Sequence, residues 1–309
     1  MRAKVSTWLS GSGRERWSAL ARALGVLIAY GLVTSSVGLP VGIGFFVFAR
    51  AVLGDELREV PIHMEDTLLF LHAIAMVLVL LAMVVVIALM IRRFDRRGSF
   101  SEIGIRSGKG TWRAVILSLA AAMALVVLIF LAARAAGAVR LVETASEEHL
   151  WSDTLIDLLG YVVLLAAIAV TEELVFRGYL RFTLAQAFSP KAVLLISALL
   201  FAIWRVVTAS SGGLGALNAF LAGLILGLLF VVTGSLWVPI AAHFAWIWVE
   251  SFVFSFPTSG VATEGLLRTQ TVSSPLLDGA YGPQGGLLAL GAFTLVVVGL
   301  WLYTRKRVH

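Results

Sequence analysis

Two adjacent glutamates, Glu172 and Glu173, end a long apolar run and are followed by Arg177. A carboxylate at bilayer depth costs roughly 2.5–3.5 kcal/mol on insertion scales, so such residues usually mark a functional site. Positions 173 and 177 are one helical turn apart, which predicts an ion pair along one face. Glu172 would then face another direction, where it could act as a general base on a water. The alternative is a Glu–Arg pair that merely anchors the helix at the membrane interface.

Two more ionisable side chains, Arg205 and His243, lie inside later apolar runs. An unpaired guanidinium in hydrocarbon is expensive. We therefore expect Arg205 to contact Glu172 or Glu173, either in a reactive site or as a structural ion pair between helices. A neutral imidazole donates one hydrogen bond and accepts another, so His243 could stabilise an oxyanion; a lone histidine on a helix is also commonly a packing residue. Glu250 follows two turns later on a similar face and could line the same cavity.

The composition is that of a membrane protein. Of 309 residues, 60% are hydrophobic and 14% are charged, and the mean hydropathy is +0.96, whereas soluble domains carry about 25% charged residues. The 24 basic and 18 acidic residues leave a net charge of +6. The basic residues stand in short clusters beside apolar runs, which indicates membrane orientation and no nucleic-acid partner. The absence of cysteine excludes disulfides, zinc-thiolate sites and thiol nucleophiles.

Runs of about 20 apolar residues predict an all-α fold, a polytopic transmembrane bundle of about eight helices. The expected helices are 23–49, 68–91, 112–133, 154–187, 191–209, 214–234, 236–256 and 285–304. Basic loops alternate with acidic ones, which predicts an integral, multi-pass inner-membrane protein with both termini in the cytoplasm.

The expected organisation has four parts. They are a basic cytoplasmic segment (1–22), N-terminal transmembrane helices with a cytoplasmic loop (23–111), a transmembrane core (112–304) and a basic cytoplasmic tail (305–309). The first apolar run is too long for a cleaved signal peptide, so we expect it to be retained as a span.

Three motifs together resemble the CPBP family, which includes the CAAX prenyl endopeptidases and bacterial bacteriocin-processing and abortive-infection-type membrane proteins. The segment Glu172-Glu173-x-x-x-Arg177 resembles the family's Glu-Glu-x-x-x-Arg signature. Phe201-x-x-x-Arg205 stands where the family carries Phe-x-x-x-His. The stretch around His243 is similar to the one that carries the family's His-x-x-x-Asn motif. The joint order and spacing of three motifs is far more specific than any one of them.

The resemblance covers roughly residues 92 to 304 and includes the stretches 256–260 and 281–286. It implies a membrane-embedded bundle with an intramembrane cavity open to the cytoplasm. It also implies that the partner is a peptide or membrane-protein substrate, with or without a lipid modification, reached in the lipid bilayer. In the family, the first glutamate, here Glu172, and the motif-two histidine activate a water that attacks a peptide bond. The motif-three His and Asn stabilise the oxyanion. Assistance by a divalent metal such as zinc stays open, although one histidine with carboxylates is a poor zinc site by ligand count.

The chain departs from this pattern at two positions that carry the chemistry, with Arg205 in place of the motif-two His and Ile247 in place of the motif-three Asn. Arginine keeps its proton, so it can neither relay a proton nor bind a metal. Ile247 supplies no hydrogen-bond donor, and losing one oxyanion donor typically costs about 10²–10³ in rate.

Three hypotheses follow. The first is an intramembrane endopeptidase in which Glu172 activates water, Arg205 positions that water or polarises the scissile carbonyl, and His243 stabilises the oxyanion. The second is a catalytically degenerate relative that keeps the fold as a membrane binding, scaffold or immunity protein. The third is a small proton-coupled transporter, although the chain shows no inverted repeat.

Overall fold

We describe a computed structural model of the chain. It covers residues 13–53, 62–95, 98–144, 151–209, 212–257, 265–272, 274–277 and 281–308. Most of the basic first segment, the acidic stretches 54–61 and 145–150, and part of the motif-like stretch 256–260 lie outside the described residues.

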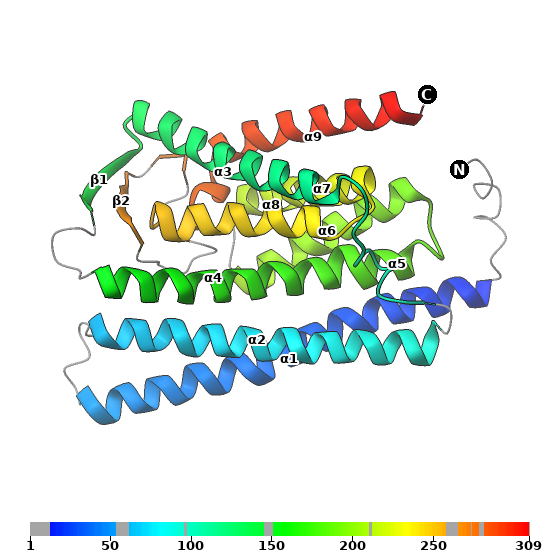
Figure 1. Cartoon of the computed structure of the whole chain (residues 1–309), viewed down its shortest axis with the longest axis horizontal. Helices are drawn as coiled ribbons and strands as arrows, with labels where there is room; N and C mark the ends of the chain where they lie inside the picture. The colour runs from blue at the N-terminus through cyan, green and yellow to red at the C-terminus, as the bar shows by residue number, and fades with distance from the viewer. Residues whose placement is uncertain are drawn as a thin grey trace.

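The fold is an all-α bundle, as predicted (Figure 1). Seven helices in the described part of the chain are long and apolar enough to cross a membrane, so the protein is an integral, multi-pass membrane protein. The α-helices are α1 (Gly13–Leu53), α2 (Ile62–Phe94), α3 (Thr111–Ala135), α4 (Trp151–Glu173), α5 (Arg181–Leu184), α6 (Pro190–Ala209), α7 (Gly213–Thr233), α8 (Trp237–Trp248) and α9 (Leu287–Val308). The π-helices are η1 (Leu174–Leu180) and η2 (Val249–Val253), and the 3₁₀ helix is η3 (Pro283–Gly285).

The predicted helix 154–187 is continuous in direction, but its hydrogen-bonding pattern changes in the middle. The α-helix α4 ends at Glu173, and the π-helical turn η1 begins at Leu174. A second π-helical turn, η2, continues α8 from Val249. Short π-helical turns within α-helices occur frequently at functional sites because they redirect side chains locally. Here one follows the paired glutamates and the other follows the helix that carries His243.

A small antiparallel sheet, which the sequence did not predict, joins two of the connecting segments. Strand β1 (Val139–Thr144) follows α3, and strand β2 (Leu267–Thr271) precedes α9. Figure 1 shows this sheet at the end of the bundle opposite the start of α1 and the end of α9. The sheet therefore lies at the end of the bundle that is far from both terminal helix ends.

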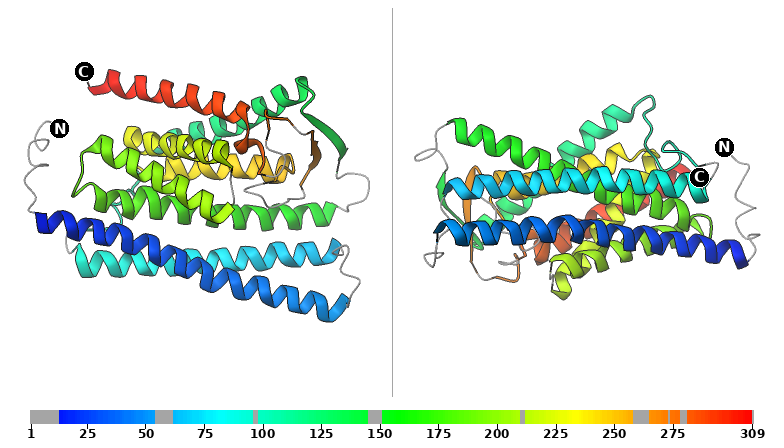
Figure 2. Two further views of the ribbon diagram at one scale, coloured as in Figure 1. Left: turned by 180° about the vertical axis from the view of Figure 1, so that it is seen from behind. Right: turned by 90° about the horizontal axis from the view of Figure 1, so that it is seen from below.

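The N-terminal helices cover one face of the bundle. Helices α1 and α2 pack against each other, α2 packs along α4, and α1 packs against η1 and α5; Figure 2 shows α1 and α2 lying side by side across this face. On the other side α3, α8 and α9 surround a second apolar cluster that includes Phe130, Phe254 and Phe293. The paired glutamates at the end of α4 lie between these two layers.

A buried polar network fastens α1 to the rest of the bundle. Arg22 of α1 forms an ion pair with Asp95, at the end of α2, and donates to Gln186 Oε1 at 2.7 Å. Asp95 also accepts from the Tyr179 hydroxyl at 2.9 Å and from Gln186 Nε2 at 3.2 Å. Every bond in this network joins elements distant in sequence, so it fixes α1 against the helix that carries the glutamates.

Candidate active site

The structure places the predicted site residues of three separate helices together inside the bundle. Glu172 and Glu173 are the last two residues of α4, Arg205 lies in α6, and His243 lies in α8. Glu172 and His243 are 3% and 7% exposed, and Glu173 is fully buried. An acid, a guanidinium and an imidazole thus share one interior location.

His243 lies between the two glutamates. Its Nδ1 is 3.1 Å from Glu173 Oε1, and its Nε2 is 3.7 Å from Glu172 Oε2. With a carboxylate as partner, Nδ1 is the donor, which fixes the ring orientation and leaves Nε2 facing Glu172. Phe201 contacts the ring edge-on, with centroids 6.2 Å apart. Nδ1 of the imidazole therefore holds the ring in position, and Nε2 is directed at Glu172.

Arg177 pairs with Glu173, as the spacing predicted. Its Nη1 is 3.0 Å from Glu173 Oε1, its Nη2 donates to the Gly223 carbonyl at 3.2 Å, and its Cζ lies 4.3 Å above the Phe201 ring. The side chain is 1% exposed. Glu173 and Arg177 therefore form an enclosed unit that supports His243 and fixes η1 against α7.

Arg205 contacts the other glutamate. Its Nη1 is 3.4 Å from Glu172 Oε1, and it also interacts electrostatically with Tyr281 and Glu250. The Glu172 carboxylate consequently has one oxygen beside a guanidinium and the other beside the imidazole. Within the described part of the chain, Glu172 Oε2 is buried and has no hydrogen-bond partner.

Two tyrosines near this cluster were given no role by the sequence analysis. Tyr30 of α1 is buried, stacks on Trp204 with ring centroids 4.4 Å apart, and interacts electrostatically with Glu172 and Arg205. Tyr281 lies beside Arg205 from the turn before α9. A neutral tyrosine carries no charge that would single it out in the sequence, and only the fold brings these two to the site.

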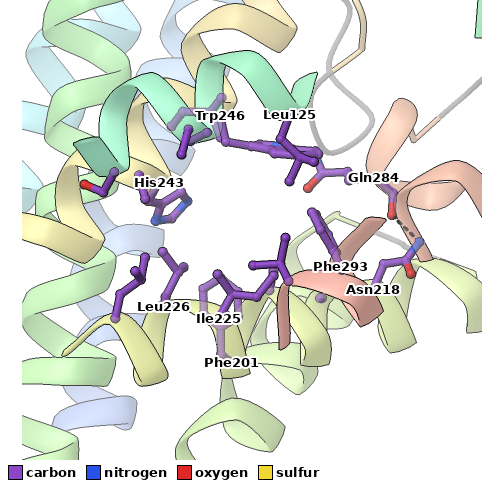
Figure 3. A pocket seen from close by; sticks show the side chains of 18 of the residues that line it. Leu125, Phe201, Asn218, Ile225, Leu226, His243, Trp246, Gln284 and Phe293 are labelled. Atoms are coloured by element: carbon purple, nitrogen blue, oxygen red, sulfur yellow. Dashed lines mark hydrogen bonds between the residues drawn. The ribbon is translucent and has the colours of Figure 1, made fainter. Parts of the chain in front are cut away.

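A cavity of about 220 Å³ adjoins the cluster (Figure 3). Its walls come from α3, α6, α7, α8, η3 and α9 and are mainly apolar. His243 lies at one end, and Arg205 and Ile247 also line the cavity. The other lining residues are Ser118, Ala121, Ala122, Leu125, Phe201, Asn218, Ala219, Ala222, Ile225, Leu226, Leu229, Ala242, Trp246, Gln284, Phe293, Val296 and Leu300.

Glu250 lies behind this wall. It is fully buried and accepts a hydrogen bond from Trp246 Nε1 at 3.1 Å. Trp246 lines the cavity, whereas Glu250 is not among the lining residues. The sequence predicted that Glu250 could line the cavity; in the structure its carboxylate instead approaches the turn before α9, where it interacts with the backbone of Gln284.

The donor set does not fit a zinc ion. His243 uses Nδ1 on Glu173, and each glutamate is paired with a guanidinium. Among the described residues, no group of three or more His, Asp or Glu side chains has an arrangement that could hold a metal.

Comparison with known proteins finds a family model that matches part of the chain. A family model described as type II CAAX prenyl endopeptidase Rce1-like matches residues 153–249, the segment that contains Glu172, Arg205 and His243. This match confirms the resemblance that the motifs indicated. Searches among curated proteins and among solved structures give no significant match.

Proposed function

We propose that the protein is an intramembrane endopeptidase of the CPBP type in which Glu172 activates the attacking water. The observation that carries this proposal is the position of Glu172 Oε2. This buried oxygen has no hydrogen-bond partner among the described residues and lies 3.7 Å from His243 Nε2. A water about 2.8 Å from each of these atoms would contact both. The water would then lie between a general base and an oriented imidazole, beside a cavity large enough for part of a peptide.

The chain's residues supply the steps of hydrolysis. Glu172 takes a proton from the water, whose oxygen attacks the carbonyl carbon of the scissile peptide bond. Glu172 then returns the proton to the leaving amine. Arg205 donates to the carbonyl oxygen as it gains negative charge, and it can do so at any pH because it stays protonated. His243 Nε2 donates to that oxygen only when the ring carries a second proton, so Arg205 is the more constant donor of the two.

The proposal also includes a substrate class and an orientation in the membrane. The substrate is a peptide or membrane-protein segment in the bilayer, with or without a lipid, and the protein lies in the inner membrane with both termini in the cytoplasm. Figure 1 supports the orientation, because α1 starts and α9 ends at one end of the bundle. Basic residues gather near that end, including Arg92 and Arg93 at the end of α2 and Arg305 in α9.

A second candidate is a non-catalytic relative that binds a membrane peptide. The Arg205–Glu172 contact favours it, because a guanidinium bound to the base competes with the water for the same carboxylate. Ile247 favours it as well, because it removes one oxyanion donor from the wall.

Cleavage in liposomes decides between the two. The probe is a quenched fluorescent peptide that ends in farnesyl-cysteine, used beside the same peptide without the lipid. Glu172→Gln is expected to lower the rate about 10²–10⁴-fold, while Glu102→Gln, which changes an exposed acid outside the site, leaves it unchanged. The double variant Arg205→His/Ile247→Asn is expected to cleave faster than the natural chain. Cleavage by the double variant alone establishes the non-catalytic candidate, and cleavage by neither refutes both the peptidase and its restored form.

A further inference from the structure

Gln284, in the turn 281–286, lines the cavity at the end opposite His243 (Figure 3). This turn lies between β2 and α9 and outside the segment matched by the family model. Gln284 sits in the short helix η3 within this turn. Figure 3 shows its side chain extending into the cavity beside the Trp246 ring, with His243 on the far side. The cavity thus has an ionisable group at one end and a carboxamide at the other.

Two fully buried polar side chains hold the backbone of Gln284. Asn218 Nδ2 donates to the Gln284 carbonyl at 2.8 Å and to the Gly286 carbonyl at 2.9 Å. Glu250 interacts with the backbone amide of Gln284. Asn218 and Glu250 are both 0% exposed. Burying polar groups is costly unless they are hydrogen-bonded. These two side chains make such bonds with the backbone of the turn, so burying them fixes the position of Gln284.

Close packing restrains the same turn further. Gly282 has φ of 95°, and a Cβ on it would lie 1.9 Å from the Pro257 carbonyl oxygen. Only glycine fits there, because the left-handed conformation and the close approach both exclude a side chain. The backbone of the turn is therefore held in place, and the Gln284 side chain extends from it into the cavity.

A carboxamide is suited to one particular kind of ligand group. It carries a donor and an acceptor side by side, as does a peptide group, so the two can form paired hydrogen bonds. A site that hydrogen-bonds a ligand in apolar surroundings rejects an analogue lacking the matching group. Apolar side chains, among them Leu125, Ile225 and Phe293, make up most of the cavity wall, and Asn218 lines it beside Gln284.

Building on the peptidase function proposed above, we propose that Gln284 is a substrate-positioning residue whose carboxamide pairs with a peptide group of the substrate. This pairing fixes which peptide bond lies beside the water that contacts Glu172 and His243. The cavity therefore takes a stretch of polypeptide backbone at this end in preference to a purely hydrocarbon chain.

The test uses two small photoreactive probes of equal shape, a diazirine-bearing N-butylhexanamide and its ester analogue. Both are crosslinked to the full chain in liposomes, and labelling of cavity-lining peptides is measured by mass spectrometry relative to labelling of α2. The natural chain is expected to label about 10-fold more with the amide than with the ester, because the ester lacks the N–H. In Gln284→Met, which keeps the length of the side chain, the ratio falls to about one.

Ile225→Val is the matched control, since it alters an apolar part of the same wall and is expected to keep the amide preference. Equal labelling by the two probes in the natural chain, absence of cavity labelling, or an unchanged preference in Gln284→Met would each overturn the proposal. No bond is hydrolysed in this experiment, so its outcome is separate from that of the cleavage assay. Where cleavage is measured, Gln284→Met is expected to raise KM about 10-fold with little change in kcat.

Discussion

The enclosed Glu173–Arg177 pair makes a quantitative prediction about stability. Arg177→Met keeps most of the volume of the side chain but removes its charge, its 3.0 Å contact with Glu173 and its bond to the Gly223 carbonyl. At an effective dielectric of about 20, opposite charges about 4 Å apart attract by about 4 kcal/mol. Breaking a buried pair by removing one partner costs about 3–5 kcal/mol, because the remaining charge stays uncompensated. We expect the free energy of unfolding to fall by about 4 kcal/mol.

A double-mutant cycle with Glu173→Gln separates this electrostatic cost from lost packing. The double variant leaves no isolated charge, so it should be more stable than the sum of the single effects by about 2 kcal/mol. Unfolding in mixed micelles with increasing SDS gives the three free energies. Arg113→Met, on an exposed position of α3, serves as control and should change stability by less than about 0.5 kcal/mol. Effects of the single changes that add to within about 0.5 kcal/mol would refute the argument that the pair acts as a unit.

Three further outcomes are expected. Asp95→Asn weakens the network that holds α1 and lowers the free energy of unfolding by about 1.5–3 kcal/mol, together with faster proteolysis of α1. Gly223→Ala places a Cβ 2.9 Å from the Ala198 backbone and should destabilise by about 1–3 kcal/mol. The same change at Gly291, where nothing lies within 4 Å, should be harmless; equal effects at the two glycines would contradict the close packing of α6 on α7. Arg205→His with Ile247→Asn should raise the cleavage rate about 10²-fold or more, because Ile247→Asn restores an oxyanion donor and Arg205→His restores the motif-two histidine.

The helices could be predicted because apolar length alone determines them. A run of about 20 apolar residues must satisfy its backbone internally in a bilayer, and a helix does so within one segment. The predicted spans accordingly coincide with α1 to α9 except at their ends, where α1, for example, begins at Gly13 instead of 23. Helix ends depend on a few local bonds, so length and hydropathy define them poorly.

The sheet could not be predicted in this way. Val139–Thr144 and Leu267–Thr271 are short, and each makes its hydrogen bonds with a partner more than a hundred residues away in the chain. β-branched residues in Val139-Arg-Leu-Val-Glu-Thr144 were a usable signal for a strand. That signal names no partner, because strand propensity is local whereas pairing depends on the tertiary fold.

Charged residues in apolar runs were the signal that predicted the site. Neutral residues of the site give no such signal, so charge could not predict them. Glu172, Glu173, Arg205 and His243 stood out because each is costly in an apolar run, and the structure brings them within 3.1–3.7 Å of one another in a chain of contacts. The bond between His243 and Glu173 was not foreseen, because it depends on how α8 packs on α4. Neutral groups such as Tyr30 carried no such signal.

Residues outside the matched segment 153–249 are necessary for this site to hold its shape. Tyr30 fixes Trp204, the neighbour of Arg205, from α1, and α1 is in turn fastened through Asp95 to Tyr179 in η1. At the other end of the cavity, Gln284 is held by Asn218 from within the matched segment. Under the proposed function, the motif residues are the reacting groups, and the flanking helices and the turn before α9 determine how a substrate meets them. Relatives that share the motifs but differ in α1 or in the turn 281–286 should consequently differ in substrate selection before they differ in chemistry.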